Sequence, residues 1–390
     1  MQDFGFDRII DRRGTHSYKY DAPEKVFGTT DVLPVWVADM DFAVPPAVTE
    51  AIRRRAEHPV YGYTFRPESY YESIVRWIKK RHRWHIEKEW IQFSPGVVPA
   101  LNLIVQGFTE PGDGVILQSP VYHPFFYAIN LNRRTLVNNP LVQRGDGSYT
   151  MDFDDLKKKA RQAKLLLLSS PHNPVGRSWS EAELRQLGEI CMENDLLIVS
   201  DEIHGDLTLP GHRHTPLASL SEEIAARTFT CMAPSKTFNL AGLSTSSVII
   251  PDPELRQRYD DLMESLHIKG GNLFGITASE AAYNHGEEWL DAMLQYVQGN
   301  VDYVRAFLQE HLPEIRLTPI EATYLLWLDF RHTGLKNEEV HDFLVHRARV
   351  GGNDGAMYGP GGEGFERINV ACPRSIVEEV FTRIHHALKK

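Results

Sequence analysis

The chain has few cysteines and no long apolar segment. Its three cysteines, Cys191, Cys231 and Cys372, are far apart and odd in number, which fits a reducing compartment better than a disulfide framework. No apolar run approaches the roughly 20 residues that a membrane helix needs. The first residues, Met-Gln-Asp-Phe-Gly-Phe-Asp, lack the basic and apolar regions of a signal peptide. We therefore expect a cytoplasmic protein that has no membrane partner.

The chain also lacks an excess of positive charge and any metal-binding motif. Its formal net charge is −10, which does not favour nucleic acid as a partner. None of its 17 histidines belongs to an H-E-x-x-H motif or a Cys/His cluster, so we expect no metal site. The segment 359–364 matches G-x-G-x-x-G. Because no predicted strand leads into it and no predicted helix follows it, we expect no dinucleotide site there.

What the chain does contain is a regular alternation of apolar strands and helices. Apolar residues make up 42% and charged residues 24% of the chain, as in ordinary globular proteins. The alternation predicts an α/β fold with a doubly wound, mostly parallel sheet. We expect strands at 114–118, 164–168, 196–200, 228–232 and 241–250, and a long helix at 286–312. Beyond that helix the order changes to strand 321–329, helix 337–347, strand 367–370 and helix 375–388.

Polar residues follow three of these predicted strands. Asn173 comes after the strand 164–168, Asp201 directly after 196–200, and Lys236 after 228–232. In open α/β sheets, binding sites form at the carboxyl ends of parallel strands. We therefore expect an amide, a carboxylate and an amine to meet in one crevice.

These three groups are the ones that pyridoxal 5′-phosphate (PLP) requires. A lysine forms a Schiff base with the cofactor, and a carboxylate partners the pyridinium nitrogen. An amide can donate to the ring oxygen, and a desolvated lysine is a usable nucleophile toward an aldehyde. Taken singly, Asp201 could instead cap a helix and Asn173 could belong to a turn. The order of all three residues favours the PLP interpretation.

Three motifs carry a resemblance to a known family. Ser-Pro-His-Asn173-Pro-Val-Gly, Ser-Asp201-Glu-Ile-His and Ser-Lys236-Thr-Phe-Asn resemble the fold-type I PLP enzymes of aminotransferase class I/II. More narrowly, the chain resembles the MalY/PatB branch of cystathionine β-lyases and cysteine-S-conjugate lyases. The resemblance implies the aspartate aminotransferase fold: a large PLP-binding domain at 46–285, with 1–45 and 286–390 forming an N-terminal arm and a small α+β domain.

The resemblance also assigns cofactor contacts. A glycine before a helix N-terminus can bind anions through backbone N–H groups, and by resemblance Gly96, Val97 and Val98 contact the cofactor phosphate. Many relatives carry Ser and Arg where this chain has Ala233 and Ser244, so the rest of the phosphate site is left open among Ser235, Thr237 and Tyr63. The remaining cofactor contacts that the resemblance implies are Tyr122 stacked on the ring, Ile203 on its other face, His204 near the ring hydroxyl and Lys236 itself.

Substrate contacts are expected from two further segments. In Phe365-Glu-Arg367-Ile-Asn369, the alternation turns Arg367 to the same side as Phe365 and Asn369, as an inward cation on a strand. By resemblance Arg367 holds the substrate α-carboxylate, with a structural ion pair as the alternative. The segment 33–42, with Asp39, resembles the arm that closes over the substrate pocket, and Tyr122 also faces the substrate. Tyr63 is implied to reach the cofactor of a second subunit, which requires a homodimer with shared sites.

Three functions are compatible with these features. The first is a PLP-dependent C–S lyase that cleaves cystathionine or cysteine S-conjugates by β-elimination into thiol, pyruvate and ammonia. The second is a PLP-dependent aminotransferase acting on amino acids. The third is a regulator that binds a partner protein, an idea based only on what some relatives do. A single convincing inward cation, Arg367, and the arm at 36–41 favour the lyase.

Overall fold

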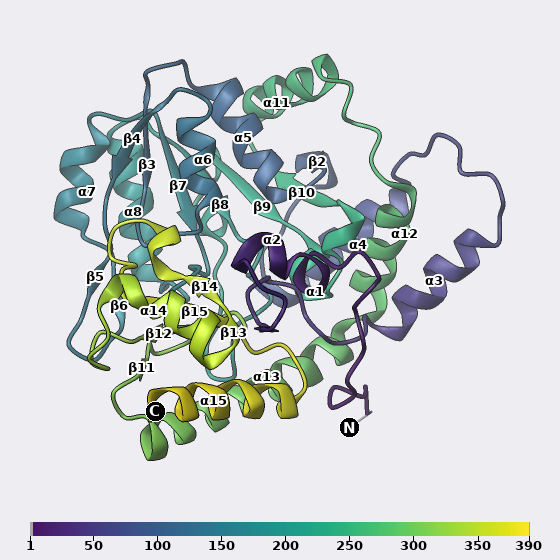
Figure 1. Ribbon diagram of the computed structural model, residues 1–390. Coiled ribbons are helices and arrows are strands. Elements are labelled where there is room, and N and C mark those ends of the chain that lie inside the picture. The colour runs from purple at the N-terminus through teal and green to yellow at the C-terminus, as the bar shows by residue number, and fades with distance from the viewer. Residues whose placement is uncertain (1–2, 390) are drawn as a thin grey trace.

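The computed structural model describes residues 3–389 (Figure 1). Its α-helices are α1 (Tyr18–Asp21), α2 (Pro23–Phe27), α3 (Pro46–Ala56), α4 (Glu68–His82), α5 (Val97–Phe108), α6 (Pro124–Asn130), α7 (Phe153–Ala160), α8 (Glu181–Glu193), α9 (Glu222–Ala225), α10 (Pro234–Thr237), α11 (Pro253–Ser265), α12 (Leu273–His285), α13 (Glu287–His311), α14 (Val340–Asp342) and α15 (Arg374–Leu388). No α-helix among these residues is long and apolar enough to span a lipid bilayer.

The larger of the two main sheets has seven strands and is mostly parallel. Its order is β2 (Ile91–Ser94), β10 (Ser246–Ile249), β9 (Thr228–Met232), β8 (Leu197–Asp201), β7 (Leu165–Ser169), β3 (Gly114–Leu117) and β4 (Thr135–Asn138). The five strands from β9 to β4 are parallel, and β10 is antiparallel to both of its neighbours. β7 and β9 are buried along their whole length and β8 at every residue but its first, as expected for a sheet that helices cover on both faces. The expected α/β fold is confirmed.

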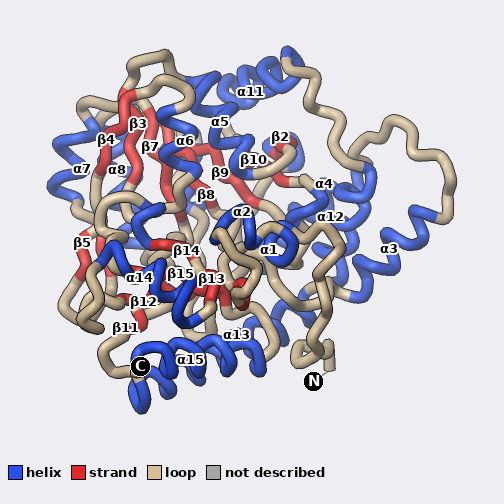
Figure 2. The backbone as a smooth tube through the Cα atoms, viewed as in Figure 1, coloured by secondary structure: helices blue, strands red, loops and turns tan. Residues whose placement is uncertain are grey.

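The second main sheet comes from the last quarter of the chain. It has the order β11 (Arg316–Leu317), β12 (Leu325–Asp329), β15 (Phe365–Asn369) and β14 (Asn353–Asp354), and its strand pairs are antiparallel. β13 (Val350–Gly351) pairs instead with the N-terminal β1 (Leu33–Pro34), and β5 (Val142–Gln143) pairs with β6 (Tyr149–Thr150). Figure 2 shows these short strands below the large sheet, beside α13 and α15. The N-terminal arm is therefore attached to the C-terminal sheet.

Most predicted elements are found close to their expected places, with one clear error. The strands expected at 164–168, 196–200 and 228–232 are β7, β8 and β9, and the long helix at 286–312 is α13. The strand expected at 241–250 is wrong in its first half, where residues 241–243 form a 3₁₀ turn. Ser244 follows with a φ of 48°, which turns the chain before β10 can begin at Ser246. The helix expected at 337–347 divides into a 3₁₀ turn, α14 and a π-helical turn.

Candidate active site

A pocket lies at the carboxyl ends of β7, β8 and β9. The register explains its position, because Asp201 at the end of β8 is paired with Ser169 of β7 and Cys231 of β9. Polar residues that follow the three strands therefore come together. Most of the predicted site residues line this pocket, namely Gly96, Val97, Val98, Tyr122, Asn173, Asp201, Ile203, His204, Ser235 and Lys236.

Lys236 enters the pocket from α10, a single turn that begins two residues after β9 ends. Its Nζ donates to the main-chain carbonyl oxygen of Ala38, 2.7 Å away. Part of the side chain is open to the pocket, but the surrounding protein encloses the amine. Burial, together with the positive charge of Arg367, lowers the pKa of Lys236 to about 8. Roughly a tenth of the amine is therefore neutral and nucleophilic at pH 7, compared with well under a hundredth for an ordinary lysine.

Asp201 is a buried carboxyl group whose hydrogen-bond partner is a backbone N–H. Its Oδ1 accepts from the N–H of Ile203 at 3.2 Å, and no Lys, Arg or His of the described chain pairs with it. Burial raises the pKa of Asp201 to about 7, although the Ile203 N–H and the charge of Lys236 act in the opposite direction. Asp201 therefore lacks the cationic partner that would stabilise its charged form.

Asn173 and Arg367 are in direct contact. Arg367 is buried on β15, and its guanidinium donates to Asn173 Oδ1 (3.1 Å), Asn353 Oδ1 (2.6 Å) and the carbonyl oxygen of Trp36 (2.9 Å). All three partners are neutral, and no carboxylate among residues 3–389 forms an ion pair with Arg367. The structural ion pair considered as an alternative is not found. The Nε of Arg367 is buried without a hydrogen-bond partner, so this cation has capacity left for an anion.

The N-terminus of α5 forms another wall of the pocket. Gly96 is the N-cap residue, and because it has no side chain it supplies no capping oxygen to Val97 and Val98. The helix has 12 residues, so its dipole places partial positive charge at this end. Ser235, Ser244 and Thr245, which carry hydroxyl groups, line the same pocket. Together these groups suit an anionic oxygen cluster such as a phosphate.

An aromatic ring and an imidazole complete the lining. Burial raises the pKa of Tyr122, which stays a neutral phenol, and Ile203 supplies an apolar contact. His204 is buried in the turn after β8. Burial lowers the pKa of His204 to about 3. Its Nδ1 has no hydrogen-bond partner, which leaves a neutral imidazole with an open position.

Tyr63 and Asp39 do not line the pocket of their own chain. Tyr63 lies in the loop between α3 and α4 and is fully exposed, with a relative exposure of 113%. Asp39 is next to Ala38, which does line the pocket, but its carboxylate forms an ion pair with Arg12 at 2.6 Å. Their expected contacts with cofactor and substrate stay predictions.

Several residues of the site were not anticipated. Ser169 is the last residue of β7, so the strand-end rule that found Asp201 could also have found it. Asp206 was missed because its role depends on distant segments. It accepts hydrogen bonds from Trp77, His82 and Thr237, and so joins α4 to the turn that carries Lys236. Ala38 was missed because it acts through its main chain, which leaves no signal in the sequence.

No three or more His, Cys, Asp and Glu side chains between residues 3 and 389 are grouped as metal ligands. The segment 359–364 forms the loop between a 3₁₀ turn and β15, and no helix opens from it. Among the described residues, the strongest candidate for a functional site is therefore the pocket around Lys236, Asp201 and Asn173.

Comparisons with known proteins agree with this geometry. The family model for aminotransferase class I and II matches residues 30–384. Cystathionine β-lyase PatB of Bacillus subtilis is 45% identical over 385 residues, which is 98% of this chain and 99% of that protein. Cystalysin from Treponema denticola, which contains a PLP cofactor, matches with a TM-score of 0.96 and 38% identity, covering 100% of this chain and 99% of the other. The PLP-bound C–S lyase from Staphylococcus hominis matches with a TM-score of 0.92 and 35% identity, covering 100% and 99%. The chain belongs to the class I and II aminotransferase family, in the branch that contains PatB.

Proposed function

We propose that this chain is a PLP-dependent C–S lyase that cleaves cystathionine or related cysteine conjugates. The observation that carries the proposal is the 45% identity to a cystathionine β-lyase over nearly the whole of both chains. The pocket adds support, because it has a lysine, an aspartate and an asparagine at or just after the ends of three adjacent strands. The products are a thiol, pyruvate and ammonia.

The residues of the pocket fit PLP. Asp201 is a buried carboxyl group without a cation, and a protonated pyridine nitrogen would supply one. The N-terminus of α5, with the hydroxyls of Ser235, Ser244 and Thr245, suits the phosphate. These hydroxyls can bind the phosphate in place of the Ser and Arg that many relatives carry at positions 233 and 244. The Nδ1 of His204 has no hydrogen-bond partner and can hydrogen-bond to a polar atom on the cofactor ring. When bound, the cofactor supplies an electron sink for negative charge that develops at the substrate Cα.

The side chains around this position have distinct tasks. The Nζ of Lys236 takes the proton from the substrate Cα, and its pKa of about 8 keeps a useful fraction of the amine unprotonated. Asp201 keeps a proton on the ring nitrogen by providing the adjacent negative charge. Arg367 binds the α-carboxylate of the substrate, because its planar guanidinium can hold a carboxylate with two parallel hydrogen bonds.

An aminotransferase is the alternative, since the matching family carries that name. Both reactions begin with removal of the Cα proton, and they diverge according to whether a β-substituent leaves. A regulatory role that depends on a partner protein is a third possibility, without a specific observation of its own. The cytoplasmic location expected from the sequence stays a prediction.

A substrate screen separates the two enzymatic functions. Purified protein loaded with PLP is given cystathionine or a cysteine S-conjugate, with and without a keto acid. A lyase forms thiol and pyruvate over many turnovers without the keto acid. If turnover stops after one equivalent per site and resumes only when a keto acid is added, the chain is an aminotransferase.

We further propose a homodimer with shared active sites. Its support is the loop between α3 and α4, which stands out from the body of the molecule (Figure 2) and exposes Val60, Tyr61, Tyr63 and Phe65. Burying these side chains against a second copy would remove apolar surface from water. Mixing inactive Lys236→Ala subunits with inactive Tyr63→Ala subunits should restore part of the activity through hybrid sites. Absence of recovery after proven subunit exchange would contradict sharing.

The proposed domain division is a large domain at 46–285, with 1–45 and 286–390 forming the arm and the small domain. It is supported by the location of the two main sheets. Every strand of the seven-stranded sheet falls between residues 91 and 249, and every strand of the four-stranded sheet falls between 316 and 369. The pairing of β1 with β13 ties the arm to the second unit.

A further inference from the structure

The N-terminal arm accepts a hydrogen bond from Lys236 at a main-chain atom. The carbonyl oxygen of Ala38 accepts one hydrogen bond from Lys236 Nζ at 2.7 Å and another from the hydroxyl of Tyr324 at 3.1 Å. Ala38 also lines the pocket. The position of this carbonyl therefore fixes where the free amine of Lys236 rests.

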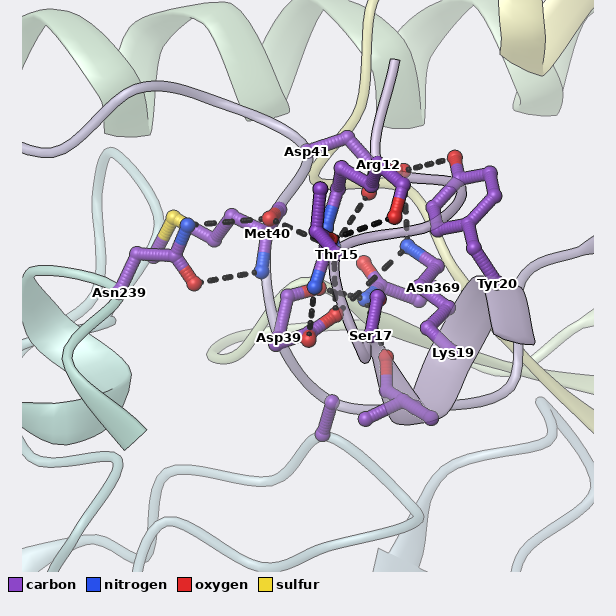
Figure 3. Close-up of polar contacts among 12 residues, drawn as sticks. Arg12, Thr15, Ser17, Lys19, Tyr20, Asp39, Met40, Asp41, Asn239 and Asn369 are labelled. Atoms are coloured by element: carbon purple, nitrogen blue, oxygen red, sulfur yellow. Dashed lines mark hydrogen bonds and ion pairs between the residues drawn. The ribbon is translucent and has the colours of Figure 1, made fainter. Parts of the chain in front are cut away.

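Behind Ala38 lies a compact group of charged side chains, which we name the arm ion cluster: Arg12, Lys19, Tyr20, Asp39 and Asp41. Figure 3 shows these residues around the chain at 39–41. Lys19 is fully buried, and its Nζ donates to Asp41 Oδ2 at 2.8 Å. Arg12 bridges the two carboxylates, at 2.6 Å from Asp39 and 2.7 Å from Asp41. The hydroxyl of Tyr20 donates to Asp41 at 3.1 Å. Two cations thus balance two carboxylates.

Two asparagines hold the same stretch of backbone from the opposite side. Asn239, three residues after Lys236, accepts from the N–H of Met40 and donates to the carbonyl oxygens of Met40 and Phe42. Asn369, at the end of β15, donates to the carbonyl oxygens of Val37 and Asp39. The backbone on each side of Ala38 is therefore fixed to both main parts of the fold, and the ion cluster fixes the arm itself.

We propose that the arm ion cluster positions the amine of Lys236 through the carbonyl oxygen of Ala38. A neutral amine that donates one N–H to a fixed acceptor turns its lone pair away from that acceptor. The Ala38 carbonyl therefore sets the direction from which Lys236 takes a proton. Ion pairs suit this task because their partners prefer one geometry, whereas apolar contacts tolerate sliding. The inference builds on the base role of Lys236 in the proposed function, but the placement of the amine can be measured independently.

The test measures the reactivity of Lys236 in the full chain after the cofactor has been removed. Lys19→Met keeps an unbranched side chain that is one atom shorter and deletes its charge. Acylation of Lys236 by a small neutral reagent is followed by mass spectrometry over time. In Lys19→Met we expect Lys236 to react about fivefold faster or more, the ratio that loss of one hydrogen bond gives. In the protein reloaded with PLP, kcat should fall more than KM changes.

A matched control separates positioning from stability. Val377→Ala opens a cavity on the buried face of α15 and leaves every residue of the arm ion cluster in place, so it serves as a variant of lowered stability. The two variants are compared at temperatures equally far below their unfolding midpoints. Faster acylation in Lys19→Met alone supports the proposal, whereas equal rates in Lys19→Met and the parent protein overturn it. Equal acceleration in Val377→Ala also overturns it.

Arg12→Met provides a second variant if Lys19→Met does not fold, because Arg12 is partly exposed and its loss leaves the Lys19–Asp41 pair in place. Its expected effect has the same sign and is smaller. Acylation of Lys236 does not depend on which substrate the enzyme uses. If the chain proves to be an aminotransferase, the acylation result still decides whether the arm positions Lys236.

Discussion

Asp201 in the pocket and Asp41 in the N-terminal arm are both buried aspartates, but their surroundings differ. Asp41 accepts hydrogen bonds from Arg12, Lys19 and Tyr20. Asp201 accepts one from a backbone N–H, and burial raises its pKa to about 7. A buried carboxylate with cationic partners has its charge compensated within the fold, whereas one without them has a charge that only a ligand can compensate. Asp41 therefore belongs to the part of the molecule that holds the site in place, and Asp201 to the part that performs the chemistry.

The pocket and the arm also differ in their lysines. Lys19 has the carboxylate of Asp41 at 2.8 Å, and Lys236 has only a neutral carbonyl oxygen as a hydrogen-bond partner. Burial and Arg367 lower the pKa of Lys236 to about 8. Of the two buried amines, Lys236 is therefore the one that can act as a base or a nucleophile near neutral pH.

The largest expected effect comes from deleting Lys236. Lys236→Ala should lower thiol release by at least about 10²–10⁴-fold, the contribution of one general base. It should also abolish the visible absorbance of the lysine-bound cofactor while the protein stays folded. Lys336→Ala, on an exposed turn, serves as the control and should keep both signals. Full absorbance and activity in Lys236→Ala would remove this residue from the mechanism.

Asp41→Asn tests the buried aspartate that has cationic partners. The change leaves the fully buried Lys19 without its nearest carboxylate, and breaking a buried pair costs about 3–5 kcal/mol. The free energy of unfolding, from urea titration, should fall by this amount. Asp302→Asn removes the same kind of group from an exposed pair with Arg305 and should change stability by less than about 0.5 kcal/mol. Similar losses in both variants would contradict the contrast.

Asp201→Asn should raise the free energy of unfolding when no cofactor is bound, whereas Asp41→Asn lowers it. In the folded chain burial raises the pKa of Asp201 from 3.8 to about 7, so the unfolded chain loses this proton at lower pH than the folded chain does. Stability is therefore unaffected below about pH 4 and is lost as pH rises through 7, by at most about 4 kcal/mol. The asparagine variant avoids this loss.

Urea titrations of the cofactor-free parent and Asp201→Asn at pH 4 and pH 8 check this expectation. The two proteins should be similar at pH 4, and the variant should be the more stable one at pH 8. With PLP bound the order should reverse, because the parent then gains the partner of its carboxylate. A variant that is less stable than the parent at both pH values without cofactor would refute the account of Asp201.

The smallest expected effect concerns Asp206, which lies five residues from Asp201 and resembles Asp41 in being paired. Burial alone would raise its pKa, but the hydrogen bond from His82 lowers it, with a further contribution from Thr237. Thr237→Val removes the hydrogen bond of 2.8 Å to Asp206 and should cost about 0.5–1.5 kcal/mol of stability. Thr277→Val, whose hydroxyl bonds only within α12, should cost less. Equal losses of stability in the two variants would show that the hydrogen bond to Asp206 contributes no more than an ordinary bond within a helix.

The sequence by itself determined the strand-end chemistry of this protein. Apolar runs located β7, β8 and β9, and the residues after them identified Asn173, Asp201 and Lys236, because a parallel sheet brings its carboxyl ends together. The resemblance to a family added Gly96, Tyr122 and His204, whose types alone are common in turns and cores. Such local signals survive in the sequence because each depends on a few adjacent residues.

Only the tertiary structure decided how these residues are held. The contact between Lys236 and Ala38 joins positions 198 apart and uses a carbonyl group that every residue has. Arg367 reaches Asn173 across 194 positions. Asp206 binds Trp77 and His82 of α4 and Thr237 of α10, two segments that are far apart in the sequence. Ser244 delays the start of a predicted strand through a positive φ that its residue type does not require. Long-range contacts are set by the packing of whole elements, so no short stretch of sequence records them.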